Sequence, residues 1–138
     1  MRLAIMQPYL FPYLGYFQLA ASVDKFVFYD DVNFIKNGWI NRNRLYLNGA
    51  VRYFTIPLSG ASPFLKINQI DVQPGELWKK KMLESVRHAY SKAPYFMAAN
   101  ELLESTLHSG ERSIAAIART SVRAVCAYAG LDTQFVDS

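Results

Sequence analysis

Three cationic side chains lie close together in the stretch YDDVNFIKNGWINRNR, which covers residues 29–44. Lys36, Arg42 and Arg44 fall within nine residues of one another. Arginine guanidinium groups bind phosphate and carboxylate through two parallel hydrogen bonds. Trp39 lies among these cations and could stack on a sugar or a base. Together these residue types predict a site for an anionic ligand that also carries a ring.

The four residues 41–44 alternate between asparagine and arginine. Side chains alternate between the two faces of a strand, so Arg42 and Arg44 should share one face while Asn41 and Asn43 share the other. The amides would orient the hydroxyl groups of a sugar. The alternative interpretation is a solvated, charged strand that opens a hairpin.

Two adjacent acids, Asp30 and Asp31, follow a strand that the sequence predicts at 26–29. Adjacent carboxylates could hold Mg²⁺, but neighbours along a strand point in opposite directions, so we assign no metal site. Asp30 is the candidate general base, because acyl or aminoacyl transfer requires deprotonation of the accepting amine or hydroxyl. Turn formation or capping is the alternative role for both acids.

The uncharged segment QPYLFPYLGYFQL, residues 7–19, follows a predicted strand at 2–7 and opens a helix. Ligands of open α/β sheets bind at this kind of position, beyond a strand and at a helix N-terminus. A glycine in the first helical turn would let a ligand or a neighbouring backbone approach closely. The candidate ligand-binding residues of this segment are Gln7, Tyr9, Tyr13, Gly15 and Tyr16. The alternative is an aromatic first turn that packs in the core.

The elements around these segments indicate an α/β fold. A helix from Pro12 to about Ser22, with Leu14, Phe17 and Ala21 at helical spacing, joins two short strands into a βαβ unit whose strands should be parallel. Asn48-Gly49 between two β-rich runs predicts a hairpin. A further strand is expected at 65–73.

Three helices are expected in the second half of the chain. Their inward residues repeat at helical spacing: Trp78, Met82, Val86 and Tyr90, then Phe96, Ala99, Leu103 and Leu107, then Ile114, Ile117, Ser121, Val125 and Tyr128. A C-capping Gly130 and a last strand at 133–138 follow. We therefore predict one α/β domain over residues 1–138, with a Rossmann-like, largely parallel sheet, an inserted β-hairpin and three C-terminal helices.

Composition excludes several classes of protein. The net charge of +4 is too slight to indicate nucleic-acid binding, no apolar run is long enough to span a bilayer, and no signal peptide opens the chain. We therefore expect a cytoplasmic protein. Cys126 fits a small buried thiol better than a nucleophile, His88 a solvated helix face, and His108 the end of a helix.

The motifs IMQPYLFPYLGYFQL and VDKFVFYDDVNFIKNGWINRNRL, with FTIPL at 54–58 and AYSKAPYF at 89–96, resemble the WbqC-like protein family of bacterial polysaccharide (O-antigen) gene clusters. The resemblance implies an enzyme of cell-surface polysaccharide biosynthesis, with acyl or aminoacyl (glycine) transfer to an activated sugar as one suggested activity. Family members are typically longer, so this chain is expected to be the N-terminal part of such a protein. The resemblance carries over no catalytic residues and no cofactor.

A second similarity concerns the strand, loop and helix at the start of the chain. Tyr13-Leu14-Gly15-Tyr16 occupies the place of the His-x-Gly-His motif in HIGH-type nucleotidylyltransferases. Phenols lack the positive charge with which those imidazoles bind phosphates, so the chemistry of that family does not transfer directly. Two alternatives remain open beside the enzyme: a nucleotide-binding or nucleotidyltransferase-like protein, and a non-catalytic binding module. The sequence does not determine the oligomeric state.

Overall fold

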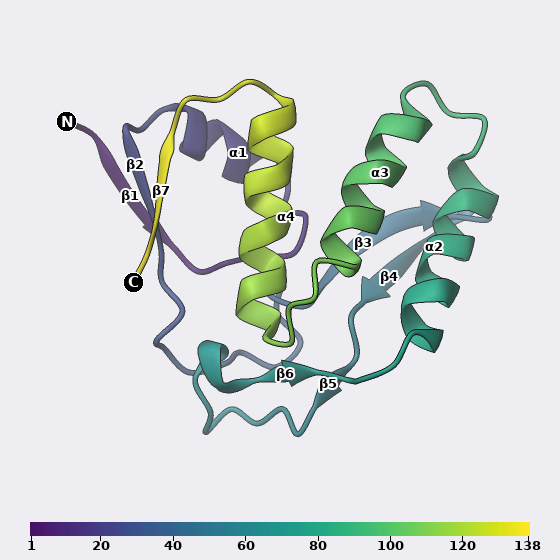
Figure 1. Cartoon of the computed structure of the whole chain (residues 1–138), viewed down its shortest axis with the longest axis horizontal. Coiled ribbons are helices and arrows are strands. Elements are labelled where there is room, and N and C mark those ends of the chain that lie inside the picture. Colours follow the sequence, from purple (N-terminus) through teal and green to yellow (C-terminus); the bar gives the residue numbers. More distant parts are fainter.

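The strand–helix–strand unit predicted at the start of the chain is present in the computed structural model, which describes residues 1–138. Figure 1 shows a small sheet on one side of the molecule and a helical and hairpin region on the other. The elements are β1 (Leu3–Met6), α1 (Leu14–Ala21), β2 (Lys25–Phe28), β3 (Arg42–Leu47), β4 (Ala50–Thr55), β5 (Leu58–Ser59), a short 3₁₀ helix (Ile67–Gln69), β6 (Asp71–Val72), α2 (Leu77–Tyr90), α3 (Phe96–Leu107), α4 (Ile114–Tyr128) and β7 (Gln134–Asp137).

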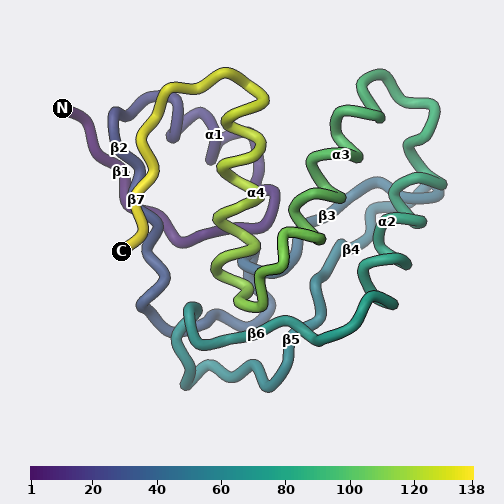
Figure 2. Tube along the Cα trace, viewed as in Figure 1, coloured from purple at the N-terminus to yellow at the C-terminus, as the bar shows by residue number.

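Three parallel strands form the main sheet in the order β1–β2–β7. Phe26 of β2 lies opposite Ala4 on one side and Phe135 on the other. The expected parallel pairing of β1 with β2 is therefore confirmed, as is the last strand. Since the three strands follow one another without a reversal of order, the structure supports a mixed α/β fold with a parallel sheet and no finer Rossmann detail. Figure 2 traces the last segment running beside β2, with both chain ends near this sheet.

Both α1 and α4 pack on the same face of the sheet. Seven buried side chains form this core: Ala4, Tyr16, Ala20, Phe26, Phe28, Val122 and Cys126. Of the predicted inward positions of α1, Phe17 packs against this core, whereas Leu14 and Ala21 are exposed. The buried residues of the helix are Tyr16 and Ala20. The opposite face of the sheet is uncovered: Leu3 and Ile5 are 55% and 56% exposed.

The predicted hairpin is confirmed at Asn48-Gly49. Both residues adopt positive φ angles, 50° and 81°, as the two central residues of a type I′ turn require. The asparagine and glycine tolerate this conformation at low cost. The turn sets β3 and β4 in antiparallel register, with Arg44 opposite Tyr53.

The larger core lies between the hairpin and the C-terminal helices. Its buried members include Leu10, Phe54, Ile56, Leu103, Leu107, Ile114 and Ile117. The three predicted helices are present as α2, α3 and α4, and Trp78, Met82 and Val86 of α2 pack on this core as expected. Helix α4 begins at a Ser113 cap and is followed by Gly130 at a φ of 73°. No helix combines the length and apolarity needed to cross a membrane.

The strand predicted at 65–73 is largely wrong. This segment instead forms the 3₁₀ helix and the two-residue strand β6. The Gln69 side chain accepts a hydrogen bond from the Lys66 amide at 2.9 Å and so closes a tight turn. Ile67 and Ile70, three residues apart, both reach the core from that turn.

Residues 7–13 form a loop that crosses between the two cores. Leu10 is fully buried, so the backbone groups around it need partners inside the protein. The Phe11 amide donates to Ser121 Oγ of α4 at 3.0 Å, and the Phe11 carbonyl accepts from Asn43 Nδ2 of β3 at 2.8 Å. The Leu10 amide donates to the Trp39 carbonyl at 3.2 Å. Side chains far apart in the sequence therefore hold the loop in place.

Replacing Ser121 with alanine should destabilise the protein because it leaves the buried Phe11 amide without an acceptor. We expect a loss of about 1–3 kcal/mol in the free energy of unfolding, measured by urea denaturation. Ser105→Ala is the matched control, since Ser105 also bonds a carbonyl of its own helix but is exposed. Its effect should stay below about 0.5 kcal/mol. Equal losses for the two variants would contradict the role given to Ser121.

Candidate functional site

The aromatic turn and the arginine-bearing strand meet at Tyr13. Arg44 Nη2 donates to the Tyr13 hydroxyl at 2.8 Å. The Tyr13 and Trp39 rings lie 5.7 Å apart between centroids, and Arg44 Cζ lies 5.4 Å from the centroid of a Trp39 ring. A guanidinium and two aromatic rings thus converge on one spot at the surface.

Local structure explains this convergence. Tyr13 caps the N-terminus of α1 in an extended conformation, which turns its side chain away from the helix. Arg44 lies on the exposed face of β3, while its neighbour Asn43 is buried and holds the Phe11 carbonyl. The predicted alternation of asparagines and arginines is therefore confirmed: Asn41 and Asn43 are buried, and Arg42 and Arg44 face outward.

Two hollows flank this cluster. The first, called here the aromatic hollow, has a volume of about 300 Å³ and is lined by Met6, Tyr9, Pro12, Tyr13, Gly15, Tyr16, Leu19, Trp39 and Asn43. The second, called here the apolar pocket, has a volume of about 440 Å³ and is lined by Phe11, Pro12, Tyr13, Asn43, Arg44, Leu45, Phe54, Val86, Tyr90, Ala93, Pro94, Phe96, Ala99, Asn100 and Leu103. Pro12, Tyr13 and Asn43 line both and form the partition between them.

The cationic residues differ in their surroundings. The Tyr13 hydrogen bond raises the pKa of the exposed Arg44 guanidinium, which remains a cation at any physiological pH. Arg42 donates to the Gly38 carbonyl at 3.1 Å and stacks over Tyr53, with Cζ 4.2 Å from the ring centroid. Lys36 is exposed and lines neither hollow. Arg44 is therefore the cation best placed to meet a ligand.

Two other candidates serve mainly to hold the structure. Tyr16 is 7% exposed, and its hydroxyl donates to the Gln7 carbonyl at 2.7 Å. Burial, more than the nearby Tyr9, raises the pKa of Tyr16 far above its usual value, so this phenol stays protonated near neutral pH and does not act as a base. Asn41 donates to the Ile56 carbonyl at 2.9 Å and is buried.

Three residues of the turn lie beside the cluster. Tyr9 is half-buried and packs on both cores, with its ring 5.6 Å from that of Tyr16. The backbone of Gln7 fixes Tyr16, and its side chain lines neither hollow. A Cβ at Gly15 would meet nothing within 4 Å, so no neighbouring backbone makes the close approach that the sequence suggested.

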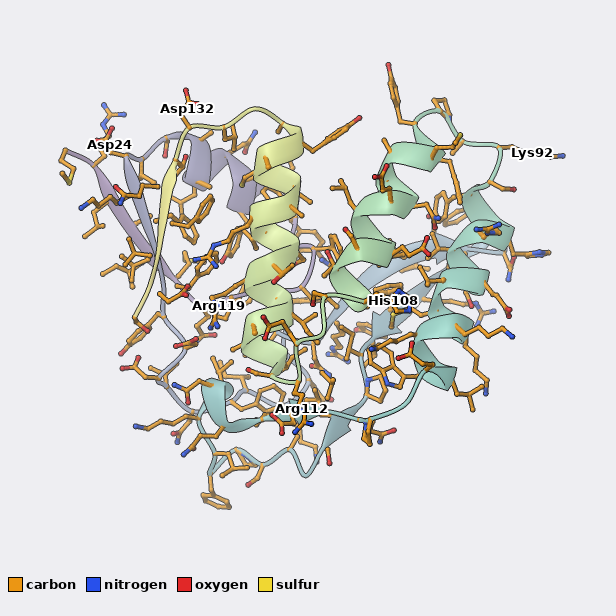
Figure 3. All side chains as sticks on the ribbon, viewed as in Figure 1. Asp24, Lys92, His108, Arg112, Arg119 and Asp132 are labelled. Atoms are coloured by element: carbon orange, nitrogen blue, oxygen red, sulfur yellow. The ribbon has the colours of Figure 1, made fainter.

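The Asp30 carboxylate is engaged in an ion pair with Arg119 of α4. Asp30 is 4% exposed and Arg119 Nη1 donates to its Oδ2, while Arg119 Nε lies 3.3 Å from Asp137 Oδ1 of β7. Figure 3 shows Arg119 between α4 and the end of β7. Arg119 thus engages the Asp30 carboxylate, which lines neither hollow, and the general-base role of Asp30 stays a prediction. Asp31 is exposed.

Sequence reasoning missed Arg119, Ser121 as a loop anchor, and Asn100. Ser121 lies within the buried stripe of α4, which also contains Ile117 and Val122, and the half-buried Arg119 lies at the edge of that stripe. A polar residue within an apolar helical stripe requires a buried partner, and this signal was available. The identity of the partner was not, since Asp30 is 89 residues away in the sequence.

Neither histidine lines the aromatic hollow or the apolar pocket, and Cys126 does not line them either. His88 is exposed on α2. His108, which is labelled in Figure 3, follows the last residue of α3, and its Nε2 lies 3.2 Å from Glu76 Oε2. Burial raises the pKa of the Cys126 thiol, which keeps it protonated. No three His, Cys, Asp or Glu side chains lie close enough together to hold a metal ion.

Replacing Arg119 with methionine should leave the buried Asp30 carboxylate without its main partner. We expect a loss of about 3 kcal/mol in the free energy of unfolding. Adding Asp30→Asn to Arg119→Met removes the stranded charge and should recover part of this loss. Urea denaturation of the two single variants and the double variant gives the coupling energy. Purely additive effects would show that the pair does not interact in solution.

A sequence model described as the WbqC-like protein family matches residues 7–138. The chain is also similar to "Uncharacterized protein Rv1507c" of Mycobacterium tuberculosis (strain ATCC 25618 / H37Rv), with 30% identity over 138 residues. That match covers 99% of this chain but only 60% of the relative's length. No solved structure matches the chain.

The family match includes both halves of the candidate site, the aromatic turn and the arginine-bearing strand, together with all three C-terminal helices. Because it extends over nearly the whole sequence, the chain belongs to the WbqC-like protein family.

Proposed function

We propose that the protein binds an anionic or nucleotide-activated sugar in the aromatic hollow, as a cytoplasmic enzyme of cell-surface (O-antigen) polysaccharide biosynthesis. One observation carries the binding part of this proposal. The Arg44 guanidinium is held by the Tyr13 hydroxyl at 2.8 Å and lies over Trp39, next to a hollow with aromatic walls. Family membership supports the pathway.

The chemistry of the cluster suits such a ligand. A guanidinium carries five N–H donors, and the Tyr13 hydrogen bond engages one nitrogen of Arg44, which leaves donors for a phosphate or carboxylate. The hydrogen bond also fixes the side chain before a ligand arrives, which lowers the entropic cost of binding. The Tyr13 and Trp39 rings offer apolar faces on which a sugar or base ring can lie.

The reaction in this proposal is acyl or aminoacyl transfer to the bound sugar. Asp30 is engaged by Arg119 and lines neither hollow, so we leave the proton acceptor unassigned among the described residues. The contribution proposed for this chain is therefore to bind and orient the sugar.

A second candidate function is nucleotide binding with nucleotidyl transfer. The observation that favours it is the position of Tyr13-Leu14-Gly15-Tyr16 at the start of α1, directly after the β1 loop. Plain nucleotides with Mg²⁺ would then bind as well as nucleotide sugars. A non-catalytic binding module would bind one of these ligands without any turnover.

A ligand screen by melting temperature should separate these functions. Nucleotide sugars, sugar phosphates, ATP, CTP and UDP would be tested with and without Mg²⁺. A true ligand at one hundred times its Kd adds about 2.7 kcal/mol of stability, a shift of roughly 10 °C for a domain of this size. We expect nucleotide sugars to give the largest shift. Stabilisation by ATP or CTP alone would favour the second function.

Arg44→Met should raise the Kd of any hit about tenfold or more, because it removes the charged fork. Tyr13→Phe should raise it by a smaller factor, since only the hydroxyl that positions Arg44 is lost. Arg52→Met is the matched control: Arg52 is an exposed cation of the same hairpin that lines neither hollow. If Arg52→Met raised the Kd as much as Arg44→Met, the affinity would depend on the net charge of the protein rather than on this site.

A further inference from the structure

The walls of the apolar pocket come from four elements and the opening loop. Figure 1 shows α2 and α3 packed over β3 and β4, and the pocket lies between these elements. Ten of its 15 lining residues are hydrophobic, and its volume of about 440 Å³ falls in the range of small-molecule sites. The pocket can therefore accept the apolar body of a small molecule.

Hydrogen bonds hold these walls in place without a ligand. The Tyr90 hydroxyl of α2 donates to the Tyr46 carbonyl of β3 at 2.5 Å, which ties the helix to the hairpin. The Asn43 amide bonds the Phe11 carbonyl on the opposite wall. A preformed pocket binds with little ordering cost.

One polar group of the wall lacks a partner. Asn100 of α3 lines the pocket, and its Oδ1 is buried without any hydrogen bond. Buried polar atoms in folded proteins are nearly always paired, because an unpaired acceptor loses its hydration without compensation. Because Oδ1 itself is sealed from water, a ligand with an N–H or O–H group would supply the missing donor once the Asn100 side chain turns toward the pocket.

The other polar feature is a cation at the open side of the pocket. Arg44 lines the pocket and is exposed, as are Pro94 and Ala99, so it marks one of the rims that face solvent. Like any arginine side chain, it is a cation at physiological pH. An anionic group would sit there while the rest of the molecule enters the pocket.

We propose that the apolar pocket binds a small amphipathic anion. Its carboxylate or phosphate meets Arg44, its acyl or other apolar body fills the space between the hairpin and the two helices, and a terminal hydroxyl or amine donates to Asn100. This inference goes beyond the proposed function, because it assigns a second ligand class to the neighbouring pocket. Both ligands would use Arg44 for their anionic group, so they would compete with each other.

Matched pairs of fatty acids test whether the ligand places its carboxylate at Arg44 and its terminal hydroxyl at Asn100. The probes are octanoate and decanoate, each compared with its ω-hydroxy acid, by isothermal titration calorimetry. Adding a hydroxyl normally weakens binding to an apolar pocket, since the hydroxyl must leave water. Here the ω-hydroxy acid that reaches Asn100 should bind about tenfold more tightly than its parent acid, as expected for one hydrogen bond to a buried acceptor.

Three variants identify the site. Asn100→Leu should reverse the preference, so that the parent acid binds better than the hydroxy acid. Ala99→Phe adds a ring to an exposed wall position and should abolish binding of both probes, whereas Met97→Phe, on the same helix but outside the pocket, should change neither. Ala99→Phe should leave nucleotide-sugar stabilisation unchanged, which separates this site from the aromatic hollow.

Several outcomes would overturn the inference. The first is that no probe binds. The second is that the hydroxyl gives no advantage in the unsubstituted protein, as it would if water alone satisfied Asn100. The third is that Asn100→Leu keeps the original preference, or that Met97→Phe abolishes binding as Ala99→Phe does. None of these outcomes bears on nucleotide-sugar binding, so the two proposals fail independently.

Discussion

The structure depends on how one buried loop satisfies its backbone hydrogen bonds. Residues 7–13 leave β1 and pass between the two cores, where Leu10 has no exposed surface. Little water reaches the backbone around Leu10, so Ser121 of α4, Asn43 of β3 and the carbonyl of Trp39 supply its hydrogen-bond partners. Hydrogen bonds thereby join α4, β3 and the segment around Trp39 to residues 10 and 11.

These hydrogen bonds also position the candidate site. Because Phe11 is held between Ser121 and Asn43, Tyr13 two residues later emerges at the start of α1 beside β3. Asn43 turns inward to bond the loop, and the alternation of the strand then turns Arg44 outward to meet Tyr13. The site therefore follows from the packing of the loop.

Much of the fold follows from patterns that act over short distances. Asn48-Gly49 determines the hairpin through its positive φ angles, and helical spacing of apolar residues predicts α2, α3 and α4. The strand predicted at 65–73 was wrong because the Gln69 side chain accepts a hydrogen bond from the Lys66 amide, which favours a tight turn over an extended strand.

The candidate site was only partly predictable, since it depends on contacts between distant residues. Sequence alone brought the tyrosines and arginines to one region, but it could not tell the exposed Tyr13 from the buried Tyr16. That difference arises because Tyr13 caps α1 while Tyr16 falls on the stripe that packs against Phe26. The pairing of Asp30 with Arg119 likewise depends on how α4 packs. The unpaired Oδ1 of Asn100 depends on how α3 packs.

The uncovered face of the parallel sheet should promote adsorption and self-association of the purified protein. Leu3, Ile5 and Val136 expose aliphatic side chains to water on this face. Parallel sheets are normally covered by apolar layers on both faces. An uncovered face binds other apolar surfaces, such as a second molecule of the protein, plastic or an alkyl-chain detergent. Dilute samples and a surface-passivated cell would therefore keep adsorption from being mistaken for specific recognition.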